Sequence, residues 1–182
     1  MRAWLLAVLL AVGLADPSRA DQKDPRLEPL FARLKTASTE AEARPVEARI
    51  WEIWGEIDEA ESRALFARGV AAMSQGDGRT AHAAFDLLVA REPEFAEGWN
   101  KRATLLYLEG DDGASVADIR RTLALEPRHF GALSGLALIY SRTQRPVDAL
   151  HCLEAALAIY PNLPGGRERL QELKREAAGD PT

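Results

Sequence analysis

Apolar side chains recur at spacings of three and four residues along most of the chain, which places them on one face of a helix. Glycine, aspartate or proline separates one short stripe from the next. The first stripe consists of Leu27, Leu30, Phe31 and Leu34, and the last of Leu170 and Leu173. The pattern predicts an all-α fold without a sheet.

The stripes repeat with a fixed period. Pro93, Pro127 and Pro161 are 34 residues apart, and each follows an apolar run. Other positions fall into the same register. Large residues recur at Leu65, Trp99 and Leu133 and at Phe85, Ile119 and Leu153; small ones at Gly69, Ala103 and Ala137 and at Ala81, Ser115 and Ala149; and turn residues at Gly76, Gly110 and Gln144.

This register predicts a helix–turn–helix hairpin in each period. Small residues let two antiparallel helices approach closely, and large residues three and four apart fill the seam between them. Glycine ends the first helix at low cost, and proline stops the second. A single hairpin leaves an apolar face uncovered, so neighbouring hairpins must stack.

The period and residue types resemble the tetratricopeptide repeat, with three copies at 62–95, 96–129 and 130–163. The resemblance implies a right-handed α-solenoid of stacked antiparallel helix hairpins. The runs GWNKRAT at 98–104 and LEPRHFGALSGL at 125–136 also resemble a family of exported, periplasmic bacterial tetratricopeptide-repeat proteins without an assigned activity.

Two further segments flank the repeats. Residues 21–61 are expected to form an N-terminal helical hairpin, a degenerate repeat or cap, since Phe31 and Trp51 lie one period before Leu65 and Phe85. Thr39 and Glu42 suit a capping box for its second helix, which Pro45 allows to begin anywhere from 40 to 45. Residues 164–182 are expected to form a polar capping helix and a frayed tail.

The first residues read as a signal peptide. An uncharged apolar stretch from Ala3 to Ala15 is too short for a comfortable membrane span, and Ser18 and Ala20 suit a cleavage site. We expect residues 1–20 to be removed, leaving an exported protein of the bacterial periplasm that does not insert into the membrane. An uncleaved anchor is the alternative.

Composition and spacing argue against catalysis, cofactors and nucleic acid. The net charge of −5 carries no basic block, which disfavours nucleic acid. His82, His129 and His151 lack metal-ligand spacing, and Asp77 and Asp111 suit helix caps better than calcium ligands. Cys152, the sole cysteine, reads as a small buried side chain. We therefore predict a non-enzyme with no cofactor and no metal.

The candidate binding surface is the concave face, which the resemblance assigns to the first helix of each repeat. Seam-forming residues such as Trp99, Ala103 and Leu106 are expected to point inward, and Asn100 and Tyr107 toward the groove. The candidate partner-binding residues are Phe66, Val70 and Met73 in the first copy, Asn100, Lys101, Thr104, Tyr107 and Leu108 in the second, and Gly131, Ser134, Leu138, Ser141 and Arg142 in the third.

This mixture of apolar, amide and hydroxyl groups suits a protein or peptide ligand. Lys101, Arg128, His129 and Arg142 favour an acidic one. Tetratricopeptide domains that clamp chaperone C-termini use Lys, Asn and Arg side chains to do so. At the matching positions this chain has Phe66, Val70, Lys101, Gly131 and Gly135, which disfavours a chaperone C-terminus as the ligand. Three alternatives stay open: the N-terminal hairpin or C-terminal helix fills the groove, the chain is a structural or self-associating envelope protein forming homo-oligomers, or it is a regulatory subunit of an envelope complex.

Overall fold

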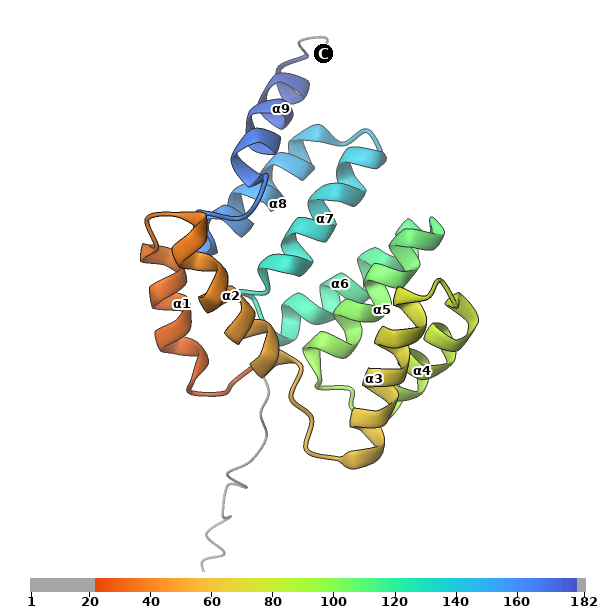
Figure 1. The fold of residues 1–182 in the computed structure, drawn as a ribbon. Coiled ribbons are helices and arrows are strands. Elements are labelled where there is room, and N and C mark those ends of the chain that lie inside the picture. The colour runs from red at the N-terminus through yellow and green to blue at the C-terminus, as the bar shows by residue number, and fades with distance from the viewer. Residues whose placement is uncertain (1–21, 180–182) are drawn as a thin grey trace, which may run out of the picture.

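The computed structural model describes residues 22–179, and the predicted signal peptide at 1–20 and the end of the predicted tail lie outside them. The described part contains helices and no strand, so the all-α prediction is confirmed (Figure 1). The helices are α1 (Leu27–Thr36), α2 (Glu40–Trp54), α3 (Ala60–Ser74), α4 (Gly78–Arg91), α5 (Ala96–Glu109), α6 (Asp112–Leu125), α7 (Phe130–Arg142), α8 (Pro146–Ile159) and α9 (Gly166–Ala178).

Six of the helices form a stack of three antiparallel hairpins. α3 pairs with α4, α5 with α6 and α7 with α8, and the contacts of α4 with α5 and of α6 with α7 join one hairpin to the next. Figure 1 shows the three pairs following one another from α3 to α8. The α9 helix packs on α8 and buries Leu173, as expected of a polar capping helix.

The small residues predicted at the close approaches are buried there. Ala81, Ser115 and Ala149 have no exposed surface. A Cβ atom added at Gly69 would lie 2.5 Å from Cε1 of Phe85, so glycine is what allows the two helices of the first hairpin to meet. The Ser115 hydroxyl donates a hydrogen bond of 2.7 Å to the Ala103 carbonyl, which satisfies a polar group inside the seam.

The turn inside each hairpin uses one left-handed residue. Gly76, Gly110 and Gln144 occupy the same place in the three copies, with φ angles of 74°, 86° and 58°. In the first two copies an aspartate follows and caps the next helix: Asp77 accepts from Thr80 N–H and Asp111 from Ala114 N–H. The prediction that these aspartates are helix caps is confirmed.

Trp99 differs from expectation. Its ring is partly exposed and belongs to none of the buried clusters, whereas Ala103 is buried and Leu106 is intermediate. The indole Nε1 donates to the Pro93 carbonyl at 3.0 Å, and the Arg102 guanidinium lies 4.9 Å from the ring centroid. The assignment of Trp99 to the buried seam is therefore wrong, because the ring lies over the loop before α5.

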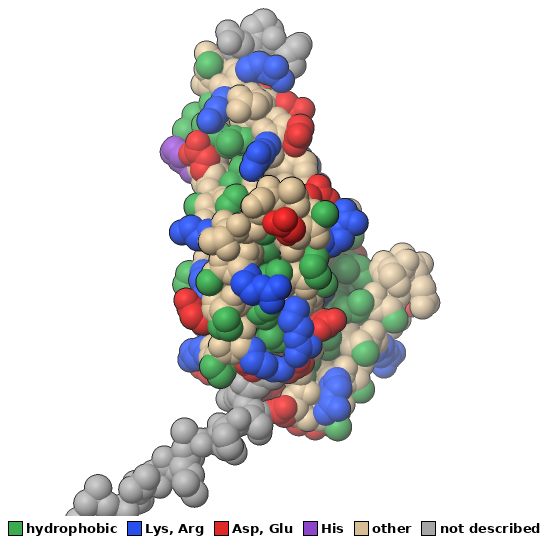
Figure 2. Space-filling view, turned by 60° about the vertical axis from the view of Figure 1, so that its left-hand side comes forward, with side chains coloured by type: hydrophobic (Ala, Val, Ile, Leu, Met, Phe, Trp, Pro, Cys, Tyr) green, Lys and Arg blue, Asp and Glu red, His purple; other side chains and the backbone are tan. Residues whose placement is uncertain are grey.

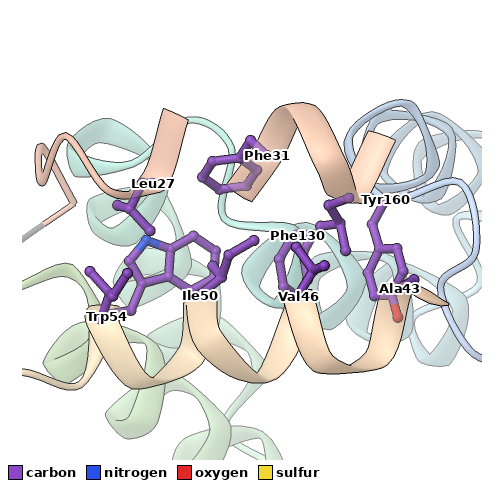
Figure 3. Packing of buried hydrophobic residues seen from close by; sticks show 10 residues of the cluster. Leu27, Phe31, Ala43, Val46, Ile50, Trp54, Phe130 and Tyr160 are labelled. Atoms are coloured by element: carbon purple, nitrogen blue, oxygen red, sulfur yellow. The ribbon is translucent and has the colours of Figure 1, made fainter. Parts of the chain in front are cut away.

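The N-terminal hairpin, α1 with α2, does not continue the stack. Phe31 and Trp54 pack instead against Phe130 at the start of α7 and Tyr160 after α8 (Figures 1 and 3). One period before Gly69 and Ala81, where the repeats need small residues, this hairpin has Lys35 and Glu47. The register match of Phe31 and Trp51 therefore does not produce a stacked fourth repeat.

The same hairpin follows the edge of the stack formed by the loops between repeats. It contacts the loop residues Glu94, Arg128 and Asn162, which are 34 residues apart and so occupy the same position in each repeat. The hydrogen bonds are Gln22 Nε2 to the Glu94 carbonyl (2.9 Å), Arg128 Nη1 to Glu28 (2.7 Å) and Asn162 Nδ2 to the Ala37 carbonyl (2.6 Å). Within it, α2 begins at Glu40, inside the expected range of 40 to 45, and Thr39 is its cap.

Candidate functional site

A groove lies between α5 and α7, the first helices of the second and third repeats. Its hollow has a volume of about 290 Å³. Pockets for drug-sized ligands have roughly 300–1,000 Å³, so this hollow is suited to a side chain or two of a larger ligand. The lining residues are Asn100, Ala103, Thr104, Tyr107, Leu108, Ser115, Ile119, Gly131, Ala132, Ser134, Gly135, Leu138 and Ile139.

Helical spacing brings these side chains together. Thr104 and Leu108 are one turn apart on α5, and Ser134 and Leu138 are one turn apart on α7. Candidates chosen from the second and third copies therefore face one another across the groove. The predicted residues on its walls are Asn100, Thr104, Tyr107, Leu108, Gly131, Ser134 and Leu138.

A second hollow of about 230 Å³ lies on the other side of α7, against α9. Ser134 and Leu138 line both hollows, so this face of α7 forms the ridge between them. The far wall includes Pro164 and Arg169, which come from the C-terminal part of the chain. The C-terminal helix thus extends the concave face instead of filling it.

Two leucines on the groove are unusually open to solvent. Leu108 is 66% exposed and Leu138 is 49% exposed. Among residues 22–179, the other large apolar side chains with comparable exposure are Leu87 and Val147, on α4 and α8. Isolated exposed leucines are ordinary, but two of them beside one hollow form an apolar rim.

Phe66, Val70 and Met73 lie elsewhere. All three are partly buried on α3, against the core that α3, α4 and the start of α5 share. Phe66 makes an edge contact with Phe95, with ring centroids 5.4 Å apart. The structure therefore uses these side chains in packing and does not bring them to the groove between α5 and α7.

Asn100 is on the groove wall but is only 7% exposed. Its Nδ2 donates a hydrogen bond of 2.9 Å to Glu97. The expectation that Asn100 offers an open amide to a ligand is thus corrected, because the amide is already bonded inside the chain.

The cations expected to attract an acidic ligand all have partners within the chain. Lys101 pairs with Glu97 at 2.9 Å, and Arg142 with Asp112 while stacking 3.9 Å from the Tyr107 centroid. The remaining two are used by the N-terminal hairpin: Arg128 pairs with Glu28, and His129 is fully buried under Trp54. Figure 2 shows basic and acidic side chains on the visible face, with several basic ones close together in its lower part.

A buried polar pair, His129 and Glu97, lies next to the groove residues Asn100 and Gly131. His129 Nδ1 accepts from the Ala132 N–H at 3.1 Å, so Nε2 carries the proton and donates to Glu97 at 3.0 Å. Burial raises the pKa of the Glu97 carboxyl, but the hydrogen bond from His129 and the charge of Lys101 outweigh it and lower that pKa. Sequence reasoning missed Glu97, since an acidic residue in the first turn of a helix is ordinary.

Trp51 of the N-terminal hairpin lies against the His129 ring at this end of the groove. A Cβ atom added at Gly131 would be 2.6 Å from Cη2 of Trp51, and the Lys101 ammonium is 5.3 Å from the centroid of the Trp51 ring. The hairpin therefore occupies part of the groove, as one of the alternatives allowed, and leaves the rest open. Its side chain occupies the end over Gly131, and the hollow beyond stays open.

Residues 22–179 contain no group of three histidine, cysteine or acidic side chains arranged to hold a metal ion. Over the same residues, no helix combines the length and the apolar character needed to cross a membrane. Cys152 lies partly buried between two apolar clusters, and burial raises the pKa of its thiol.

Comparison with known proteins defines the class. The tetratricopeptide-repeat family profile matches residues 66–124 and 113–164, and the chain belongs to this family. A TPR repeat-containing protein of Rhizobium etli is 34% identical over 157 residues, which cover 86% of this chain and 77% of that protein. A homologue of the BBSome complex member BBS4 from Drosophila melanogaster is 28% identical over 95 residues, covering 52% of this chain and 20% of that protein.

Solved structures share the fold. The TPR2B domain of yeast Sti1, in its complex with pHsp70, superposes with a TM-score of 0.59 at 20% identity, covering 68% of this chain and all of that domain. The first TPR domain of Spaghetti (RPAP3), bound to the HSP90 peptide SRMEEVD, gives 0.63 at 18% identity, covering 67% of this chain and 97% of that one. The predicted tetratricopeptide-repeat fold is confirmed.

Proposed function

We propose that this chain is a non-catalytic adaptor or scaffold that binds a protein or peptide ligand on its concave surface, between α5, α7 and α9. The observation that carries the proposal is the apolar rim of Leu108 and Leu138 beside an open hollow. Such concave surfaces of repeat proteins are typical binding faces. The structural neighbours with bound HSP90 or Hsp70 ligands support a peptide as the occupant.

The ligand differs in kind from an acidic chaperone tail. The cations near the groove, Lys101 and Arg142, are engaged by Glu97 and Asp112. A carboxylate entering the groove would lose hydration without gaining an unengaged positive partner, which costs binding free energy. An apolar peptide segment has no such cost and gains from covering Leu108 and Leu138.

A peptide selection tests the proposal. Phage-displayed random dodecapeptides are selected on the purified protein, and dissociation constants are measured for synthetic copies of the enriched peptides. Leu138→Glu is expected to weaken their binding at least tenfold. Leu87→Glu is the matched control. Leu87 is 46% exposed, a fraction similar to the 49% of Leu138, but it lies on α4, outside the groove. An empty selection, or an equal loss in both variants, would contradict the proposal.

The place of action proposed is the bacterial periplasm, after removal of residues 1–20. It is supported by the uncharged apolar stretch from Ala3 to Ala15 and by the small residues Ser18 and Ala20. The intact mass of the exported protein is expected to correspond to a chain that begins at Asp21. A retained Met1 would point to an anchored protein instead.

A further inference from the structure

The chain itself shows how an aromatic side chain sits in the groove. Trp51 from α2 lies directly over Gly131, where any Cβ atom would collide with the ring. The rings of His129 and Phe130 meet Trp51 edge-on, with centroids 5.4 Å and 5.3 Å away. The Lys101 ammonium lies 5.3 Å from the centroid of the same ring. Glycine on α7 thus creates a place for a flat apolar group.

A second glycine lies one helical turn further along α7. Gly135 follows Gly131 by four residues, so the two share a face of the helix. A Cβ atom added at Gly135 would meet Cδ1 of Ile119 at 3.6 Å, which is ordinary contact. The open hollow of about 290 Å³ lies over this second glycine, bordered by Thr104 and Leu138. Both glycines line this hollow, and the ring of Trp51 lies against Gly131 but not against Gly135.

We infer that the hollow over Gly135 is a specificity pocket for an uncharged aromatic side chain of the ligand, which binds there as Trp51 binds over Gly131. This inference rests on the proposed peptide-binding function and names the side chain that the groove selects. A ring in this place covers the apolar surface of Leu138.

Charge supports an uncharged ring over an acidic group. The nearest cations, Lys101 and Arg142, are held by Glu97 and Asp112. The walls otherwise offer the Thr104 and Ser134 hydroxyls, which donate to backbone carbonyls one turn earlier at 2.9 Å and 2.7 Å. An aromatic group needs no counter-charge, and its edge tolerates nearby hydroxyl oxygens.

Small probes test the pocket separately from any peptide. The ¹⁵N-labelled protein is titrated with N-acetyl-tryptophanamide and, in parallel, with N-acetyl-glutamic acid amide, and amide chemical shifts are followed. The aromatic probe is expected to shift Gly135, Leu138 and Thr104 and to bind at least tenfold more tightly than the acidic probe. Equal or tighter binding of the acidic probe, or saturable shifts that spare Gly135, would overturn the inference.

Two variants localise the probe. Gly135→Leu fills the pocket and is expected to weaken binding of N-acetyl-tryptophanamide at least tenfold. Gly113→Leu is the matched control, because Gly113 is exposed on α6 and outside the groove. Trp51→Ala removes the ring that lies against Gly131, so the same probe is expected to shift Gly131 more than it does in the unaltered protein. Undiminished binding in a folded Gly135→Leu protein, or a Gly131 shift in Trp51→Ala no larger than in the unaltered protein, would contradict the inference.

The outcomes separate this inference from the proposed function. Enriched dodecapeptides that depend on Leu138 but contain no aromatic residue would overturn the pocket and leave peptide binding standing. Specific binding of the aromatic probe at Gly135 with an empty peptide selection would support the pocket and overturn the proposed function.

Discussion

The N-terminal hairpin and the hairpins of the stack are built from similar amphipathic helices but are held in place differently. In the stack, a small residue such as Ala81 lets the helices meet, and Phe85 fills the seam over Gly69. In the N-terminal hairpin, the corresponding places hold Lys35 and Glu47. Its buried contacts run instead through aromatic rings to the edge of the stack.

This difference shows that the amphipathic pattern of a repeat and its small residues have separate roles. Amphipathic spacing makes a hairpin, whereas the small residues set how closely its two helices pack against each other. A hairpin without those small residues still has an apolar face to bury. Here it buries that face on Phe130 and Tyr160, at the edge where the loops between repeats repeat every 34 residues.

The largest expected effect breaks the two regions apart. Phe130→Ala and Phe85→Ala each remove a buried ring, and each is expected to lower the free energy of unfolding by roughly 3–5 kcal/mol. The consequences should differ in place. Phe130→Ala is expected to expose the amides of α1 and α2 to hydrogen exchange first, because Phe130 joins that hairpin to the stack, whereas Phe85→Ala loosens α3 and α4. Identical exchange patterns in the two variants would contradict the division.

The fold of the stack could be predicted from the sequence because the residues that determine it are close together in the chain and recur in each repeat. The register of Ala81, Ser115 and Ala149 states where helices touch, and all three are fully buried. The position of the N-terminal hairpin could not be predicted from the sequence. It depends on Trp54 and Phe31 meeting Phe130 and Tyr160, about 75 to 130 residues later in the chain, and no period links those residues.

The candidate site was predictable to the extent that one helix face decides it. Thr104, Tyr107, Ser134 and Leu138 share the groove because residues three and four apart share a face. The roles of charged groups were not predictable in this way. Lys101 looked available on its helix, yet its partner Glu97 is buried by a histidine from the next loop.

The second prediction concerns the buried pair at the boundary of the two regions. Because the pKa of Glu97 is lowered in the folded protein, its contribution to stability is present above the unfolded value and is lost as the pH falls through the folded value. Unfolding experiments are expected to show stability declining below pH 4.5, the ordinary value for this carboxyl. Glu97→Gln is expected to cost about 1–3 kcal/mol at neutral pH and to flatten that decline. If stability falls with pH as steeply in Glu97→Gln as in the unaltered protein, a group other than Glu97 is responsible for the decline.

The third prediction stays within the stack and is stabilising. Gln144 has a φ of 58°, where its counterparts Gly76 and Gly110 have no Cβ atom to strain. Gln144→Gly is expected to raise the free energy of unfolding by about 1 kcal/mol. Gly110→Gln is the matched reverse change and is expected to lower it by a similar amount. Thermal or urea unfolding of both variants measures this, and a destabilised Gln144→Gly would mean that the glutamine side chain stabilises the turn more than its backbone strain costs.

The smallest expected effect asks which contacts hold the N-terminal hairpin to the loop edge. Glu28 reaches Arg128 at 2.7 Å, but its side chain is 80% exposed, so water screens the pair. Glu28→Gln is therefore expected to change the free energy of unfolding by less than about 0.5 kcal/mol. Arg128→Ala is expected to cost more, about 1–3 kcal/mol, because the guanidinium also lies 4.1 Å from the Phe31 ring centroid and bonds to the buried carboxylate of Glu126. Equal effects of the two variants in urea unfolding would mean that the exposed ion pair, and not the ring contact and the buried carboxylate, accounts for what Arg128 contributes.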